Sequence, residues 1–269
     1  MLIRKKPRVL VIRTAGTNCD IETSFAFEAS GAVAERVHIN RLISGEKKVG
    51  DYSIIAIPGG FSYGDDIASG KILANEIKYK LGGDIRRFIL SGRPIIGICN
   101  GFQVLVKSGF LPNAGGGFRT AEATLSLNDS AKFEDRWVYL KHEHGPGGAS
   151  ACIWTRGIER VIALPVAHAE GKFITADNGV MRSLEKNRQI VFRYTGAEGL
   201  PGPYPVNPNG SAGDVAGVCD PSGTVFGLMP HPERHIQFTQ HPFWTKTGKT
   251  GEGDGLAIFR NGVVFAKSL

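Results

Sequence analysis

A cysteine set between two glycines is the residue of this chain best suited to chemistry. Cys99 ends the apolar run 95–98, and residues 102–106 then take a helical pattern. A sharp strand-to-helix turn that presents a reactive side chain is a nucleophile elbow, and the helix N-terminus beside the sulfur favours thiolate over thiol. Gly97 and Gly101 leave room where a Cβ would clash, and either can take a positive φ. A buried, inert cysteine is the alternative that this pattern leaves open.

A cysteine nucleophile needs a base, and the base needs an orienting group. His231 follows an apolar stretch, and only Pro232 separates it from Glu233. In extended backbone, residues i and i+2 point to the same side, so the Glu233 carboxylate can accept the Nδ1 proton and leave Nε2 aimed at the sulfur. We therefore expect His231 to be the base and Glu233 to orient it. A histidine that merely caps a loop is the alternative.

Two other histidine patterns compete with this pair. His168 and Glu170 have the same spacing after the apolar stretch 161–166, so spacing alone does not exclude them. Residues 142–144 read His-Glu-His, but no third ligand follows at metal-site spacing, which favours a surface turn. We predict no metal site in this chain.

Acyl chemistry at a thiolate also needs hydrogen-bond donors for the oxyanion. Pro58 ends an apolar strand and is followed by Gly59, Gly60 and Phe61, where bare backbone N–H groups can approach a substrate. The N–H of Asn100, next to the cysteine, is the natural second donor. We expect these groups to form the oxyanion site.

The first 110 residues alternate between strand and helix patterns. The expected strands are 8–13, 34–39, 52–57 and the run that ends before Cys99, and the expected helices are 21–31 and 68–81. We expect Asn18 or Asp20 to cap the first helix. This alternation predicts a mostly parallel sheet with helices on both faces, in which ligands bind beyond the carboxyl ends of the strands. Gly59, Gly60 and Cys99 all lie at such ends.

The pattern becomes antiparallel after residue 109. The expected strands are 121–127 and 136–140, followed by a hairpin of 215–219 with 224–229. Loops rich in Gly, Pro and Asn cover 143–150 and 196–213. The last expected element is a helix over 256–266. We predict a single α/β domain over residues 8–269. Residues 1–7 form a basic lead, and residues 236–269 form a C-terminal loop and helix extension.

Composition narrows the class of protein. The chain has 269 residues, 42% of them hydrophobic, and a net charge of +7 that is spread along the sequence. Spread charge without a nucleic-acid-binding motif indicates a solvated surface or a face for an acidic partner, so no nucleic acid is expected. No signal peptide or membrane-spanning run is recognisable, and the four cysteines lack metal-site or disulfide spacing. We therefore expect a cytoplasmic protein with reduced thiols and no membrane contact.

Five blocks of residues along the chain together resemble a known family. The blocks that carry this resemblance are 59–65, 97–103, 133–137, 207–211 and 229–234. The chain resembles class I (triad) glutamine amidotransferases, and most closely the glutaminase subunits of phosphoribosylformylglycinamidine synthases. The blocks span nearly the whole chain. The sequence departs from the family at residues 14–15, Lys132 and residues 66–69, which affects expected partner contacts but none of the catalytic positions.

The resemblance implies a flavodoxin-like fold and a glutaminase reaction. Cys99 would attack the side-chain amide of glutamine to give a γ-glutamyl thioester and ammonia. His231 would act as base and then as acid, with Glu233 orienting it. The resemblance also assigns the oxyanion site to residues 59–61 with the Asn100 N–H, and gives Gln103 a role in binding glutamine.

The resemblance further implies partners. Ammonia would pass to a separate synthetase subunit, which uses ATP and Mg²⁺ to convert formylglycinamide ribonucleotide to formylglycinamidine ribonucleotide in de novo purine biosynthesis. A small accessory subunit would bridge the two, and this chain would hold no cofactor of its own. His168 and Glu170 would be structural or would line the ammonia route. A free-standing cysteine hydrolase or γ-glutamyl peptidase on the same fold is the alternative, and a degenerate regulatory module is a second one.

Overall fold

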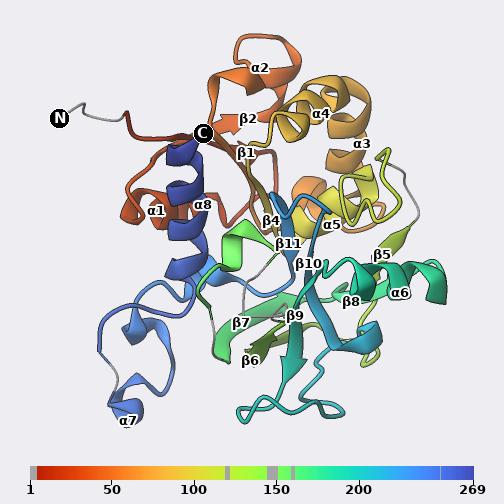
Figure 1. Cartoon of the computed structure of the whole chain (residues 1–269), viewed down its shortest axis with the longest axis vertical. Helices are drawn as coiled ribbons and strands as arrows, with labels where there is room; N and C mark the ends of the chain where they lie inside the picture. The colour runs from red at the N-terminus through yellow and green to blue at the C-terminus, as the bar shows by residue number, and fades with distance from the viewer. Residues whose placement is uncertain (1–4, 119–121, 144–150, 159–160, 249) are drawn as a thin grey trace.

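One large sheet forms the centre of the molecule (Figure 1). The computed structural model describes residues 5–118, 122–143, 151–158, 161–248 and 250–269. Within these residues the sheet has nine strands, in the spatial order β2 (Val33–His38), β1 (Arg8–Arg13), β3 (Ile54–Ile57), β4 (Ile95–Ile98), β11 (Val225–Leu228), β10 (Val215–Cys219), β9 (Ile190–Thr195), β6 (Glu134–His142) and β7 (Ile162–His168). A separate antiparallel pair joins β5 (Ala123–Ser126) to β8 (Lys172–Thr175).

The direction of pairing changes once across the sheet. From β2 to β11 every neighbouring pair is parallel, and from β11 to β7 every pair is antiparallel. Parallel strands are covered on both faces and therefore read as continuous apolar runs, as β3 and β4 do. The predicted mostly parallel sheet with an antiparallel extension is confirmed.

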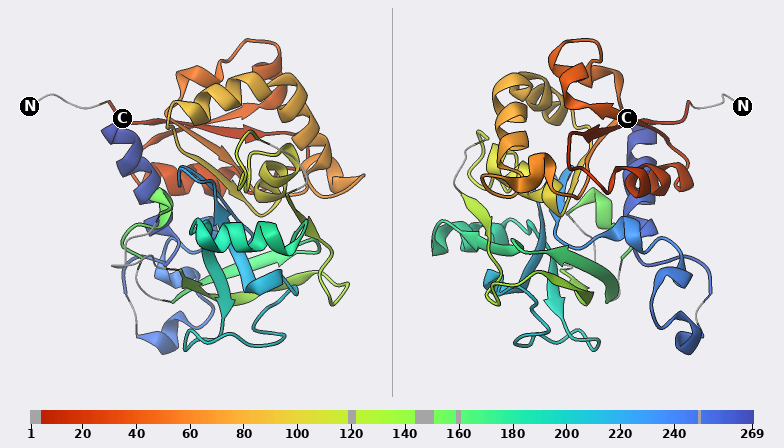
Figure 2. Two further views of the ribbon diagram at one scale, coloured as in Figure 1. Left: turned by 45° about the vertical axis from the view of Figure 1, so that its right-hand side comes forward. Right: turned by 180° about the vertical axis from the view of Figure 1, so that it is seen from behind.

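Helices cover both faces of the parallel half. The helices are α1 (Asp20–Ala29), α2 (Ile39–Ile43), α3 (Lys71–Lys80), α4 (Gly82–Leu90), α5 (Asn100–Ser108), α6 (Asn178–Lys186), α7 (Trp244–Thr247) and α8 (Leu256–Ser268). Figures 1 and 2 show α1 beside α8 on one side, with α3, α4 and α5 grouped on the other. Phe27 of α1 meets Phe259 of α8 edge to face, with ring centroids 5.0 Å apart, so aromatic packing joins the C-terminal helix to the first one.

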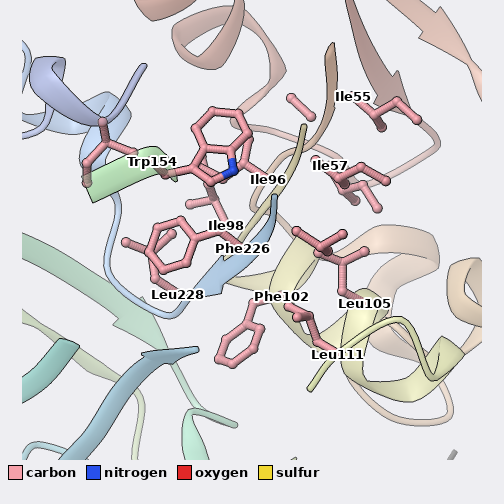
Figure 3. Close-up of a cluster of buried hydrophobic side chains, with 14 of the residues drawn as sticks. Ile55, Ile57, Ile96, Ile98, Phe102, Leu105, Leu111, Trp154, Phe226 and Leu228 are labelled. Carbon is pink, nitrogen blue, oxygen red and sulfur yellow. The ribbon is translucent and has the colours of Figure 1, made fainter. Parts of the chain in front are cut away.

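The core beneath the elbow is built from neighbouring strands and α5. Figure 3 shows buried side chains of β3, β4, β11 and α5 meeting there, among them Ile57, Ile98, Phe102, Leu105 and Leu228. All of these side chains are buried, so the segment that carries Cys99 rests on a closely packed base.

Some expectations about local structure are wrong. Neither Asn18 nor Asp20 caps α1: the N-cap residue is Cys19, which makes no capping bond with its side chain. Asp20 is instead the first helical residue and pairs with Arg13 at 3.4 Å. Helix α4 was not expected, because Gly82 interrupts the pattern there and hides the apolar spacing that follows it.

The first residue of the His-Glu-His stretch, His142, lies in a strand and not in the expected surface turn. His142 ends β6 and is buried, with Nδ1 2.5 Å from the carbonyl oxygen of Ile158. His144 lies outside the described residues.

The C-terminal segment leaves the sheet after β11. It passes through 3-10 turns and α7 in a loop that projects from the body, and returns as α8 (Figure 1). Among the described residues, no helix has the length and apolar character required to cross a membrane.

The contact of Gly101 with β3 yields a test of this packing. A Cβ at Gly101 would lie 1.8 Å from the carbonyl oxygen of Ile57, a backbone atom that no rotamer change can move. We expect Gly101→Ala to lower the free energy of unfolding by about 3 kcal/mol or more, measured by urea denaturation. Gly50→Ala is the control, because no atom lies within 4 Å of a Cβ there, and it should change stability by less than about 0.5 kcal/mol. Equal effects of the two substitutions would contradict this account.

Candidate active site

Cys99 lies at a strained turn between β4 and α5. Its φ is 50° and its ψ is −106°, a backbone conformation that non-glycine residues rarely adopt and that concentrates at functional sites. Its N–H donates to the carbonyl oxygen of Leu228 in β11 at 2.8 Å, which fixes the turn to the neighbouring strand. The strain therefore falls on the cysteine itself, and neither Gly97 nor Gly101 takes a positive φ.

The two glycines serve close packing instead. A Cβ at Gly97 would lie 2.6 Å from the carbonyl oxygen of Gly101, and a Cβ at Gly101 would overlap Ile57 of β3. Helix α5 thus starts directly against the sheet, and its free N–H groups and positive dipole end lie at the sulfur.

His231 and Glu233 form a buried pair just after β11. Nδ1 of His231 lies 2.6 Å from Oε1 of Glu233, and the two side chains are 2% and 0% exposed. The backbone between them is a 3-10 turn over Pro232–Arg234 rather than the expected extended strand, yet the side chains still meet. Nε2 of His231 is buried and has no hydrogen-bond partner in the described part of the chain, which leaves it available for proton transfer.

The environment of His231 favours its protonated form. Burial on its own would lower the pKa of His231, but the charges of Glu233 and Cys99 and the nearby Cys19 thiol outweigh burial and raise the pKa well above its ordinary value. A histidine with a raised pKa holds a proton beside the sulfur, as an acid for a leaving group must.

Cys99 and His231 line one small cavity of about 220 Å³. Gly60, Phe61 and Ala167 also line it, and the sulfur of Cys99 lies 3.7 Å from the carbonyl oxygen of Ala167. The cavity is smaller than the roughly 300–1,000 Å³ typical of drug-sized ligands, so it suits a substrate of amino-acid size. A larger cavity of about 430 Å³ lies between residues 5–8 and the end of α8, at the opposite ends of the strands, and none of the expected catalytic residues lines it.

The glycine loop after β3 offers fewer free donors than expected. The N–H of Phe61 donates to the carbonyl oxygen of Gly16 at 2.9 Å, whereas the N–H of Gly60 makes no hydrogen bond within the described residues. Gly59 leaves room for the His231 ring, because a Cβ there would lie 2.7 Å from Cε1 of His231. The N–H groups of Gly60 and Asn100 are therefore the candidate oxyanion donors in this conformation.

The side chain of Asn100 has a role that sequence reasoning missed. Its Oδ1 accepts hydrogen bonds from the N–H (3.2 Å) and the hydroxyl (2.7 Å) of Ser62, and its Nδ2 donates to Asp65 at 3.1 Å. Asn100 thus ties the loop that carries Gly60 to the first residue of α5. Ser62 is 38 residues away, so no local pattern reveals this contact.

Gln103 makes contacts within the chain that the sequence did not predict. Its Oε1 accepts from Asn100 at 3.0 Å and its Nε2 donates to the carbonyl oxygen of Glu170 at 2.5 Å, so both ends of the carboxamide have partners. In this conformation Gln103 holds the turn after β7 against α5.

The competing pair His168 and Glu170 does not meet. Nδ1 of His168 lies 3.1 Å from Oδ1 of Asn128, while Glu170 lies 3.7 Å from Lys107. Burial, with a smaller effect from the charge of His231, lowers the pKa of His168 to about 3. A base at neutral pH needs a pKa nearer 7. The low pKa of His168 and the absence of a contact with Glu170 therefore favour His231 as the candidate base.

Cys19 also lies at the site, although no sequence pattern pointed to it. Its sulfur is 4.0 Å from Nδ1 of His231 and 3.1 Å from Nη2 of Arg234, and it lines the same cavity as Cys99.

The fold and this arrangement define the class of the protein. A mostly parallel α/β sheet, a cysteine elbow after β4 and a His-Glu pair after the adjacent β11 are the architecture of a class I glutamine amidotransferase. The family model of the CobB/CobQ-like glutamine amidotransferase domain matches residues 6–266, and the chain belongs to this family.

Similar proteins match over their full lengths. The chain is 48% identical to phosphoribosylformylglycinamidine synthase subunit PurQ of Dehalococcoides mccartyi, over 98% of this chain and 99% of that protein. It is 42% identical to the PurQ subunit of Archaeoglobus fulgidus over 99% of each chain. A chain in the solved structure of PurLQS from Thermotoga maritima superimposes with a TM-score of 0.72 at 31% identity, over 97% of this chain and 99% of that one. The similarity therefore covers the whole fold as well as the site.

The His231–Glu233 pair predicts a pH-dependent contribution to stability. Because the folded-state pKa of His231 is raised, the pair stabilises fully below the unfolded value of about 6.5, and this stabilisation is lost as pH rises through the folded value. We expect Glu233→Gln to lower the free energy of unfolding by about 1.5–3 kcal/mol near pH 6, with a smaller loss at alkaline pH, measured by urea denaturation across pH.

The matched control for this prediction is Glu185→Gln. Glu185 forms an exposed ion pair with Arg193 at 3.4 Å, so its removal should have little effect at any pH. A loss for Glu233→Gln that is constant with pH, or that grows toward alkaline pH, would contradict the assigned direction of the His231 shift.

Proposed function

We propose that this chain is the glutaminase subunit of a phosphoribosylformylglycinamidine synthase. It hydrolyses glutamine to glutamate and ammonia and supplies the ammonia to a synthetase subunit, which converts formylglycinamide ribonucleotide to formylglycinamidine ribonucleotide with ATP in de novo purine biosynthesis. The observation that carries the proposal is the strained Cys99 on the same small cavity as the buried His231–Glu233 pair. The full-length similarity to proteins named as PurQ subunits supports the choice of pathway.

The geometry supports a two-step acyl transfer. The Cys99 thiolate attacks the side-chain amide carbon of glutamine, and the N–H groups of Gly60 and Asn100 stabilise the oxyanion. Nε2 of His231 gives its proton to the leaving nitrogen, so the C–N bond breaks, ammonia departs and a γ-glutamyl thioester remains. His231 then takes a proton from water, which attacks the thioester and regenerates the thiolate. Glu233 holds the imidazole through Nδ1 throughout.

We assign the other substrates of the overall reaction to partner subunits. In this proposal ATP and Mg²⁺ bind to the synthetase subunit, and a small accessory subunit joins the assembly. The similarity to a chain in the PurLQS structure from Thermotoga maritima supports an assembly of several subunits. Phe61 and Phe133 stack at the cavity with ring centroids 6.3 Å apart and are 44% and 49% exposed, which gives a partner an apolar contact beside the active site. We place the protein in the cytoplasm, because its four cysteines are free in the structure and cytosolic proteins keep their thiols reduced.

A free-standing cysteine hydrolase or γ-glutamyl peptidase is the alternative. It would use the same Cys99 chemistry without a partner and act on a larger substrate. The full-length similarity to named synthase subunits favours the glutaminase subunit.

Loss of the nucleophile should abolish the reaction. We expect Cys99→Ala to lower the rate of glutamine hydrolysis by at least about 10³-fold, because no other group in the mechanism forms the thioester. Cys152→Ala makes the same change at a buried cysteine outside the cavity and should retain activity. The measurement is the rate of glutamate production from glutamine by each purified variant. Full activity of Cys99→Ala would refute the mechanism.

Addition of the partner distinguishes the two functions. Glutamine hydrolysis should be weak for the chain alone and strong with a matching synthetase subunit, accessory subunit, ATP and formylglycinamide ribonucleotide. Equal rates with and without these components would favour the free-standing hydrolase.

The Asn100 side chain should matter through the glycine loop. Asn100→Ala keeps the backbone N–H of residue 100 but removes the hydrogen bonds to Ser62, so the loop that carries Gly60 loosens. We expect kcat for glutamine hydrolysis to fall by about 10-fold or more, since one misplaced oxyanion donor costs up to about 10²–10³. Alkylation of Cys99 by iodoacetamide should continue at a similar rate. A parallel loss of alkylation would mean that the nucleophile itself had moved.

A further inference from the structure

Cys19 lies at the edge of the His231 ring that faces Glu233. One ligand atom from each of Cys19, His231 and Glu233 lies within 4.8 Å of the other two, and all three residues are buried. The distances to Nδ1 of His231 are 4.0 Å from the Cys19 sulfur and 2.6 Å from Glu233 Oε1. Neither the elbow nor the oxyanion loop accounts for a thiol at this place.

We propose that Cys19, His231 and Glu233 form an inhibitory site for a thiophilic divalent cation such as Zn²⁺. Sulfur, imidazole nitrogen and carboxylate oxygen are the ligands that Zn²⁺ prefers, and tetrahedral bonds of about 2.0–2.3 Å place ligand atoms roughly 3.3–3.8 Å apart. The two measured distances bracket this range, so small side-chain rotations complete the site. The ion enters through the 220 Å³ cavity, which both Cys19 and His231 line.

An unpartnered carboxylate oxygen independently indicates a ligand at this place. Oε2 of Glu233 is buried and has no hydrogen-bond partner among the described residues, although the side chain is 0% exposed. A buried acceptor without a partner is unfavourable, and a cation would satisfy it.

Two neighbours adapt to the ion. Nη2 of Arg234 lies 3.1 Å from the Cys19 sulfur and must turn away; its side chain is 38% exposed and already contacts Glu22 at 3.3 Å. Oδ1 of Asn18 lies 3.3 Å from the same sulfur and, like a water molecule, can supply the fourth ligand.

Metal binding would stop proton transfer at the base. The cation bonds to the Cys19 sulfur and to Nδ1, and both the thiol proton and the Nδ1 proton of the imidazolium leave to solvent. The neutral ring then carries its one proton on Nε2. Donation of that proton to the leaving nitrogen would leave an imidazolate, so the ring no longer acts as the acid, and Glu233 no longer orients it. The inhibitory part of the proposal rests on the proposed glutaminase function, whereas metal binding itself does not.

Binding is tested with Co²⁺ in the absence of the nucleophile. In the Cys99→Ala chain, Co²⁺ should produce a thiolate-to-cobalt charge-transfer absorption with a stoichiometry of one ion per chain. Adding Cys19→Ser, which retains the size of the side chain, should abolish the absorption, while adding Cys152→Ala should leave it intact. Circular dichroism and the thermal midpoint of each variant verify folding. An absorption that is absent in Cys99→Ala, or that survives Cys19→Ser, would overturn the proposed site.

Inhibition is tested with Zn²⁺ and glutamine. For each variant the rate is expressed relative to its own rate without metal, so any change in basal activity cancels. The Zn²⁺ concentration for half-inhibition should be at least about tenfold higher in Cys19→Ser than in the unmodified chain. Loss of an outer-shell partner of a metal ligand already costs about 10–100-fold in affinity, and Cys19 is a direct ligand in this proposal. Equal sensitivity would refute inhibition at this site. A chain that binds Co²⁺ through Cys19 but hydrolyses no glutamine would contradict the proposed function and leave the metal site standing.

Discussion

The approach of one helix to the sheet, backbone against backbone, fixes the active site. Helix α5 begins so close to β3 that a side chain at Gly101 would overlap the Ile57 carbonyl group, and Gly97 faces the same constraint from Gly101. Because the helix cannot move outward without breaking this contact, the turn at Cys99 must absorb the strain as a positive φ. The position of the sulfur, of the Asn100 N–H and of the loop held by the Asn100 side chain all follow from this single close approach.

The second determinant of the site is electrostatic. Burying a histidine disfavours its charged form, and Glu233 reverses that preference because its carboxylate is just as deeply buried and lies 2.6 Å away. His168, at the end of β7, shows the opposite outcome: it is similarly buried but has an asparagine for a partner, and the pKa of His168 is lowered to about 3. Two histidines in the same region thus have different chemistry because their nearest partners differ in charge.

Much of the fold and site could be predicted from the sequence, and the site contacts that were missed have a common cause. Apolar runs and their alternation predicted the mostly parallel sheet, and the residue blocks around Cys99 and His231 predicted the family; the comparisons confirm both. The contacts of Asn100 with Ser62, of Gln103 with Glu170 and of Cys19 with His231 join residues 38, 67 and 212 positions apart. Such contacts depend on how strands are ordered in space, which no local pattern records. The roles of the individual site residues remain predictions.

The order of the strands has a consequence for the life of the chain during synthesis. Cys99 follows β4, but His231, the proposed base, follows β11, a strand made about 130 residues later that inserts directly beside β4. A growing chain can fold its first parallel strands and still lack His231, because β11 and the residues after it have not yet been made. With these proposed roles, half-made chains do not hydrolyse glutamine, and ammonia production begins only when the polypeptide is nearly complete and able to meet its partner.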